Sequence, residues 1–136
     1  MKRYMSLDIG DATIGVAVSD LLGLTAQGVE TIRRRDLSDD LNRLGVLIQE
    51  YEADALVAGL PKHMNGQEGE RCALVRAFMA DAAERFPMME IHYWDERLST
   101  VAASRTLLEG DVSRKKRRKV IDKMAAVYIL QGFLDR

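Results

Sequence analysis

The sequence contains very little cysteine and histidine. Its 136 residues include one cysteine, Cys72, which excludes an intramolecular disulfide and a metal site built from several cysteines. The two histidines, His63 and His92, have no second ligand at helical spacing, so the pattern does not favour a zinc site. No stretch rich in proline, glycine or serine suggests a linker. We therefore predict a single domain over residues 1–136.

Long apolar runs and an excess of either charge are missing as well. No apolar segment approaches the roughly 20 residues that a membrane-spanning helix needs. Asp8 interrupts the first apolar segment too early for a signal sequence. We therefore expect a cytoplasmic protein with no membrane partner. The 20 Lys and Arg residues nearly balance the 21 Asp and Glu residues, and a net charge of −1 argues at first against a polyanionic partner.

The positive charge is nevertheless concentrated near the C-terminal end. Residues 111–136 hold 8 basic and 3 acidic residues, whereas residues 1–110 hold 12 basic and 18 acidic residues. Six basic residues are consecutive, namely Arg114, Lys115, Lys116, Arg117, Arg118 and Lys119. Because Lys and Arg neutralise backbone phosphates, we expect this run to bind nucleic acid, with an affinity that falls steeply with salt. The shorter cluster Arg33-Arg34-Arg35 is interpreted as a solvated strand end.

The hydrophobic pattern predicts five strands. They are expected over residues 3–9, 13–19, 25–32, 55–58 and 90–93. The turn signal Gly10-Asp11-Ala12 joins the first two strands as a hairpin, and the third continues an antiparallel meander. The segment at 55–58 is short and wholly apolar, which is typical of a buried parallel strand.

Four helices are expected between and after these strands. They are predicted at about 36–51, 68–85, 98–109 and 120–134, with residues 111–119 as a basic connection. In the second helix, Leu74, Phe78 and Ala82 are expected to face the core. The resulting fold is α/β, with a mixed five-stranded sheet, a three-strand antiparallel meander plus parallel strands, and helices on both faces.

Three acidic residues stand where this pattern would favour other side chains. Asp8 lies at the end of the first predicted strand, and Glu96 follows the apolar segment at 91–94. Asp122 continues the inward-facing stripe of the last predicted helix. Each has an ordinary interpretation as well: a turn residue, a solvated helix entry, and an acid that interacts with a helix dipole.

The predicted topology can bring these three carboxylates to one edge of the sheet. Ligand sites in open α/β sheets lie at the carboxyl ends of the strands. Clustered carboxylates bind hard cations such as Mg²⁺. Two such ions about 3.5–4 Å apart can activate water and stabilise the leaving oxygen of a phosphodiester.

Four stretches then indicate a family. They are LDIGDATIGVAVSD at 7–20, GLPKHMNG at 59–66, DERLST at 95–100 and IDKMAA at 121–126. In their order and spacing they resemble the YqgF/RuvX family, described as Holliday junction resolvases and as pre-16S rRNA nucleases. Two positions depart from the family pattern: Ala12-Thr13 replaces a common basic pair, and Asn65 stands where Asp is usual. Asn and Asp both suit a turn before glycine.

The resemblance implies a ribonuclease H-like fold and a metal-dependent nuclease. The acids of the family map onto Asp8, Glu96 and Asp122, which would bind two Mg²⁺ or Mn²⁺ ions. The implied function is 5′-end processing of pre-16S rRNA, and the alternative is Holliday junction cleavage in branched DNA. Arg97 could pair with a carboxylate or hold the scissile phosphate, and Lys62 could contact the substrate.

Other functions remain open on the sequence alone. The Asp-x-Gly at Asp8-Ile9-Gly10 also occurs in the phosphate loop of actin-like ATPase and sugar kinase lobes, although one lobe is too short to clamp ATP. A non-catalytic nucleic-acid-binding module with the same fold is a further alternative. A monomer and a homodimer are both compatible with the sequence, and a junction resolvase would need two active sites.

Overall fold

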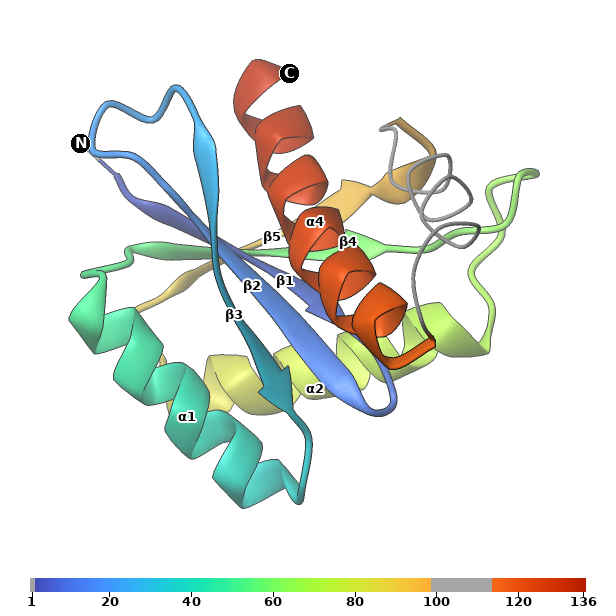
Figure 1. Cartoon of the computed structure of the whole chain (residues 1–136), viewed down its shortest axis with the longest axis horizontal. Coiled ribbons are helices and arrows are strands. Elements are labelled where there is room, and N and C mark those ends of the chain that lie inside the picture. The colour runs from blue at the N-terminus through green and yellow to red at the C-terminus, as the bar shows by residue number, and fades with distance from the viewer. Residues whose placement is uncertain (1, 99–113) are drawn as a thin grey trace.

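The described part of the chain forms a five-stranded mixed sheet, shown in Figure 1. The computed structural model describes residues 2–98 and 114–136, and side chains are described for 2–98 and 124–136. The strands are β1 (Tyr4–Ile9), β2 (Thr13–Ser19), β3 (Ala26–Arg33), β4 (Ala55–Leu60) and β5 (Glu90–Asp95). Their spatial order is β3-β2-β1-β4-β5, with β1 to β3 antiparallel and β1, β4 and β5 parallel. The predicted meander and parallel strands are therefore confirmed.

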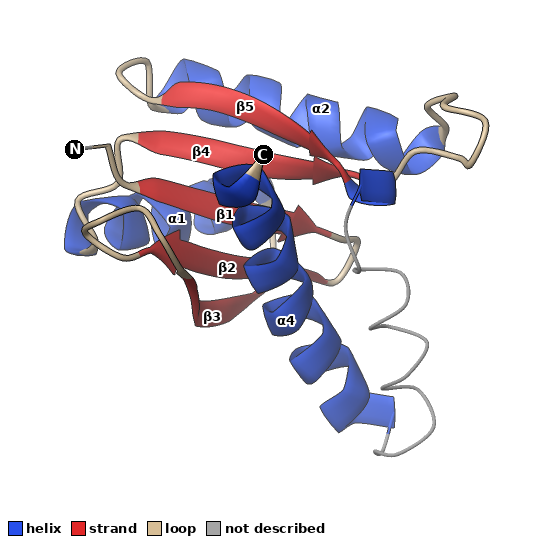
Figure 2. Ribbon diagram, turned by 90° about the horizontal axis from the view of Figure 1, so that it is seen from above, coloured by secondary structure: helices blue, strands red, loops and turns tan. Residues whose placement is uncertain are grey.

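Helices cover both faces of this sheet, as predicted (Figure 2). Helices α1 (Leu37–Glu50) and α2 (Glu70–Arg85) pack on one face, over the larger of two hydrophobic clusters. Helix α4 (Arg114–Asp135) crosses the other face and forms a second cluster with Ala17 and Val57. A short 3₁₀ helix, η1 (Glu96–Leu98), follows β5. No helix within the described residues combines the length and the apolar character that crossing a membrane requires.

Helix α4 begins earlier than the sequence pattern predicts. The expected start was residue 120, but the helix begins at Arg114, so residues 114–119 are helical and not a connection. Lys and Arg are good helix formers, and this segment contains no glycine or proline that would end a helix. The helix predicted at 98–109 lies outside the described residues, apart from Leu98 at the end of η1.

The buried face of α2 also differs from the prediction. Leu74 is half exposed, and the inward stripe consists of Cys72, Val75, Phe78, Met79 and Ala82. Spacing of i, i+4, i+8 drifts by about 40° per step around a helix, so Leu74 leaves the face that its partners share. Burial is the main reason why the pKa of the Cys72 thiol is raised, in line with an inert residue.

Side chains of β1 alternate between the two faces of the sheet. Met5, Leu7 and Ile9 belong to the cluster beneath α1 and α2. Between them, Ser6 faces α4, because its Oγ donates a hydrogen bond of 2.6 Å to the carbonyl oxygen of Ala126. The same alternation places Asp8 on the face that α4 covers. Strand alternation therefore decides the face on which Asp8 lies, because Met5, Leu7 and Ile9 occupy the opposite face and point into the core.

Candidate active site

The carboxyl ends of three neighbouring strands bring two of the predicted acids to one edge of the sheet. β1 pairs with β4 in parallel with Leu7 opposite Ala58, and β4 pairs with β5 with Leu60 opposite Asp95. Asp8 lies near the end of β1, and Glu96 directly follows β5. Both side chains are buried, with exposed fractions of 6% for Asp8 and 9% for Glu96. Glu96 is therefore not a solvated helix entry.

Gly59 on the central strand β4 makes room for the Glu96 carboxylate. A Cβ atom at this position would lie 3.2 Å from Glu96 Oε2 and 2.5 Å from Ile129 Cδ1. Ile129 belongs to α4, so the Glu96 carboxylate lies over Gly59 on the face that α4 covers. Asp8 occupies the same face by strand alternation. The two carboxylates thus share an edge and a face of the sheet.

The third predicted acid, Asp122, belongs to α4. Its side chain is outside the described residues, but its helical position can be placed from its neighbours. Ala126, Ile129 and Phe133 are buried against the sheet, which confirms the inward stripe that position 122 would continue. Position 122 precedes Ala126 by about one helical turn.

The direction of α4 brings this turn toward Asp8. The Phe133 ring packs on Tyr4 at the start of β1, with ring centroids 5.2 Å apart. Further toward the helix N-terminus, Ala126 contacts Ser6. Ser6 lies midway between Tyr4 and Asp8 on β1. The next turn of α4 therefore continues in the direction of Asp8.

The donors at this edge suit a hard divalent cation. Carboxylate oxygens are the ligands that Mg²⁺ and Mn²⁺ prefer, and Mg²⁺ usually needs only one or two of them with water and substrate oxygens. Among the described side chains, no group of three potential metal ligands occurs. Of the three acids predicted as metal ligands, the structure describes the side chains of Asp8 and Glu96.

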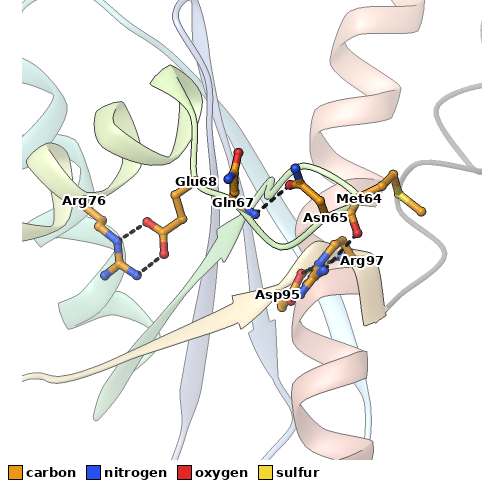
Figure 3. A network of polar contacts seen from close by, with 7 residues as sticks. All are labelled: Met64, Asn65, Gln67, Glu68, Arg76, Asp95 and Arg97. Atoms are coloured by element: carbon orange, nitrogen blue, oxygen red, sulfur yellow. Dashed lines mark hydrogen bonds and ion pairs between the residues drawn. The ribbon is translucent and has the colours of Figure 1, made fainter.

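Arg97 is bound to a carboxylate, and its partner is Asp95, which sequence reasoning did not single out. Arg97 Nε lies 3.0 Å and Nη2 2.6 Å from Asp95 Oδ2 (Figure 3). Its Nη1 donates a hydrogen bond of 3.2 Å to the Met64 carbonyl oxygen. Arg97 is the main reason why the pKa of the Asp95 carboxyl is lowered. Of the two roles expected for Arg97, carboxylate pairing is present in the structure.

The loop at 61–69 between β4 and α2 has the turn that its sequence predicts. Asn65 Oδ1 accepts a hydrogen bond of 3.0 Å from the Gln67 N–H. Gly66 follows with a φ of 88°, a conformation that favours glycine. Lys62 is half-buried at the start of the loop and contributes, after Arg97, to the lowered pKa of Asp95. The His63 ring packs on the backbone of Gly69, where α2 begins.

Replacing Asp95 with asparagine is expected to loosen this loop. Pairing with Arg97 lowers the pKa of the Asp95 carboxyl in the folded state. The pair therefore stabilises the fold fully above the unfolded-state pKa near 4, and this contribution is lost as pH falls through the lower folded-state pKa. Asp95→Asn should therefore lower the free energy of unfolding by about 1 kcal/mol at pH 7 and by less near pH 3. Urea unfolding at both pH values measures this difference.

The amide of Gly66 provides a local readout for the same variant. Gly66 N–H donates to the His63 carbonyl oxygen at 2.8 Å, so its hydrogen exchange should be faster in Asp95→Asn. Asp81→Asn, at a half-exposed position of α2, is the control and should change neither quantity. Equal unfolding energies and equal Gly66 exchange in wild type and Asp95→Asn would contradict a stabilising role of the pair.

The cluster at 33–35 is not simply a solvated strand end. Arg34 Nη1 donates a hydrogen bond of 2.9 Å to the Gly10 carbonyl oxygen, and its Nε lies 3.0 Å from Oδ2 of the buried Asp40. These contacts tie the turn after β1, two residues beyond Asp8, to α1. A run of three arginines does not reveal which of them is partly buried and paired, so sequence reasoning missed both Arg34 and Asp40.

Comparison with known proteins gives one family and one fold. The model of the RuvX family, described as Holliday junction resolvase, matches residues 2–136. A protein of Heliobacterium modesticaldum named "Putative pre-16S rRNA nuclease" is 54% identical over 133 residues, which cover 98% of this chain and 89% of that protein. A protein of the same name from Desulforamulus reducens is 55% identical over 133 residues, which cover 98% of this chain and 96% of that protein.

Solved structures agree with the predicted fold. The RuvC protein of T. thermophilus in complex with a Holliday junction substrate aligns with a TM-score of 0.60 at 12% identity, covering 100% of this chain and 96% of that one. The yeast mitochondrial Holliday junction resolvase Ydc2 aligns with a TM-score of 0.58 at 9% identity, covering 98% and 78%. At such low identity the likeness concerns the fold alone, which is the ribonuclease H-like fold expected from the sequence.

Proposed function

The chain belongs to the RuvX family and is a nuclease, and we propose that it hydrolyses phosphodiester bonds with divalent metal ions held at the acidic edge of its sheet. The observation that carries this proposal is the burial of Asp8 and Glu96 on one face of the sheet, at the carboxyl ends of the two strands that lie on either side of β4. Carboxylate oxygens are the ligands that hard divalent cations prefer, so two carboxylates at one end of the sheet suit such an ion.

Asp8, Glu96 and Asp122 would hold two Mg²⁺ or Mn²⁺ ions. When bound, such ions supply a more acidic water as nucleophile and stabilise charge on the leaving oxygen. The protein side chains orient and shield this chemistry. Gly59 leaves space for the Glu96 carboxylate, and Ile129 packs beside it on α4. The apolar contact limits water on that side, which strengthens electrostatic interactions at the carboxylates.

The basic start of α4 would bind the phosphates of the substrate. Figure 2 shows that the N-terminal turns of α4 extend past the strands. These turns contain Arg114, Lys115, Lys116, Arg117, Arg118 and Lys119. Six consecutive positions are spread around a helix at 100° intervals, so roughly half of them can contact a single strand. Lys62 and Arg97 would add positive charge near the acids, with Arg97 acting mainly through its pairing with Asp95.

Pre-16S rRNA is the substrate that the names of the relatives favour. Both proteins described above are more than half identical to this chain, and both are named after this activity. The description of the family favours a Holliday junction as the second candidate. The two candidates differ in the assembly they need, because cleavage of two strands of a junction requires two active sites and hence a dimer.

A paired cleavage assay tests this proposal. Wild-type protein is incubated with a precursor rRNA fragment and with a four-way DNA junction, each with Mg²⁺ or Mn²⁺ and with EDTA, while the molar mass is measured in solution. We expect metal-dependent cleavage of the RNA by a monomer or dimer, and loss of cleavage in Asp122→Asn. Asp135→Asn, an exposed acid on the same helix, is the control and should cleave normally.

Each outcome of this assay has a separate meaning. Equal activity with and without EDTA would contradict metal dependence. Cleavage of the junction alone, by a dimer, would favour the resolvase function over rRNA processing. ATP binding without cleavage of either substrate would favour the kinase-lobe alternative, and binding of both substrates without cleavage would favour the non-catalytic module.

A further inference from the structure

Met64 is a strongly exposed apolar side chain beside the candidate active site. Its side chain is 88% exposed, and it lies in the loop at 61–69 that leaves the carboxyl end of β4. This is the edge of the sheet at which Asp8 and Glu96 are found. A single exposed apolar residue needs no explanation by itself. What distinguishes Met64 is that the backbone around it is held in place.

Contacts on both sides of Met64 restrain its backbone. Its carbonyl oxygen accepts the hydrogen bond from Arg97, which Asp95 anchors to the end of β5. Before it, the His63 N–H donates to the Gln67 carbonyl oxygen at 2.9 Å, which closes the loop on itself. The Arg97 guanidinium therefore ties the loop to the strand that immediately precedes Glu96.

Gly66 allows this close approach of loop and guanidinium. A Cβ atom at Gly66 would lie 3.3 Å from Arg97 Nη1, and the φ of 88° would strain any other residue. Figure 3 shows the Met64 side chain directed away from the Asp95–Arg97 pair. The loop thus presents an apolar side chain outward from a fixed position, close to the proposed site of cleavage.

The charges around this side chain favour a nucleic acid as its partner. Arg97, whose side chain is 31% exposed, and the half-buried Lys62 both place positive charge in this part of the molecule. The phosphates of a nucleic acid can pair with these cations, but they make no favourable contact with the thioether of Met64. The apolar surfaces of a nucleic acid are the faces of its bases, and a methionine sulfur makes favourable contacts with aromatic rings. Methionine and leucine are among the apolar side chains that insert between base steps and partly unstack them.

We propose that Met64 contacts the face of an unpaired nucleobase next to the scissile phosphate. The proposal rests on the nuclease function above and deepens it, because it defines the substrate class: nucleic acid whose bases are unstacked at the cleavage site. In a continuous duplex the base faces are covered by their neighbours. Arg97 is then a positioning residue, which acts through the loop that carries Met64.

Two variants and a control test this contact. Met64→Ala removes the apolar side chain, and Met64→Leu keeps its apolar character at similar size. Met88→Ala is the matched control, because Met88 is 93% exposed but lies in the turn before the start of β5, at the opposite end of that strand from Glu96. The probe is an oligonucleotide of the cleaved sequence with 2-aminopurine beside the scissile bond, prepared unpaired and fully paired.

We expect Met64→Ala to lower kcat/KM on the unpaired substrate by roughly tenfold, within the range measured for side chains that stack on bases. The effect should fall mainly on KM, and the paired substrate should be affected little. Met64→Leu should retain most activity, and Met88→Ala should match wild type. Wild-type kinetics for Met64→Ala on the unpaired substrate, or an equal loss in Met88→Ala, would overturn the proposal.

Binding measured in EDTA separates this inference from the nuclease function. The 2-aminopurine fluorescence of the unpaired probe should change on binding wild-type protein and change less with Met64→Ala. If wild type cleaves neither probe but this difference is present, the proposed cleavage fails and the base contact stands. If wild type cleaves and the fluorescence is the same for both proteins, the base contact is overturned and the nuclease function stands.

Discussion

Replacing Asp8 with asparagine is expected to lower the rate of phosphodiester cleavage by more than about a hundredfold. Loss of residues that only support metal ligands costs about 10–100-fold, so loss of a ligand should cost more. The fold should be unaffected, because asparagine has the same shape as aspartate and a buried amide costs less desolvation than a buried carboxylate. Single-turnover cleavage and the unfolding temperature measure the two effects.

Metal binding gives Asp8→Asn a readout that does not depend on activity. A ligand that binds the folded state raises its stability, so Mn²⁺ should raise the unfolding temperature of wild type and do so much less for the variant. Asp11→Asn is the matched control, since Asp11 is exposed three residues away in the turn. Wild-type cleavage by Asp8→Asn would refute the role of this carboxylate, and an equal loss in Asp11→Asn would show that the turn as a whole is responsible.

The substitution Gly59→Ala is expected to have the largest effect on stability. Its Cβ would lie 2.5 Å from Ile129 Cδ1, so α4 or the strand must shift. Overpacking of this kind costs about 3 kcal/mol in the free energy of unfolding. The same Cβ would lie 3.2 Å from Glu96 Oε2 and displace the carboxylate by a few tenths of an ångström. We therefore expect cleavage to fall by at least about tenfold as well.

A second substitution separates these two consequences. Ile129→Val removes the Cδ1 atom and alone should cost about 1 kcal/mol. In the double variant Gly59→Ala/Ile129→Val the contact of 2.5 Å is removed and only the tight contact of 3.0 Å with Cγ1 remains, so the two costs should not add and part of the lost stability should return. Cleavage should stay low, because the contact with Glu96 persists. Recovery of both properties would show that Gly59 acts only through packing.

Much of the sheet could be predicted because its signals are local. The turn between β1 and β2 contains Gly10, whose N–H donates to the Thr13 carbonyl oxygen at 2.9 Å. Asp36 caps α1, since its Oδ1 accepts the Asp39 N–H at 2.8 Å. Such contacts join residues a few positions apart, so the residue types alone indicate them. The start of α4 was mispredicted because charge was taken as a sign of a loop, whereas Lys and Arg favour helix.

The candidate site was predictable only in part, for a physical reason. Asp8 and Glu96 were found because each interrupts an apolar pattern, and burial confirms that both are unusual. Asp95 lies beside Glu96 in the sequence but was missed, because its role depends on Arg97 turning back to the strand end. Gly59 was recognised only as part of a family motif, and its role beside Glu96 was missed because it comes from Ile129 on a helix far away in the sequence.

The sequence by itself determined the family, the succession of the described strands along the chain and the mixed character of the sheet that they form. These properties follow from residue types and from their spacing along the chain, which periodicity and motifs express directly. Only the tertiary structure decided that Glu96 lies over Gly59, that Arg97 holds the loop of Met64, and that Arg34 binds the turn after Asp8. Each of these contacts joins segments distant in the sequence, and whether they meet depends on how the sheet and helices pack.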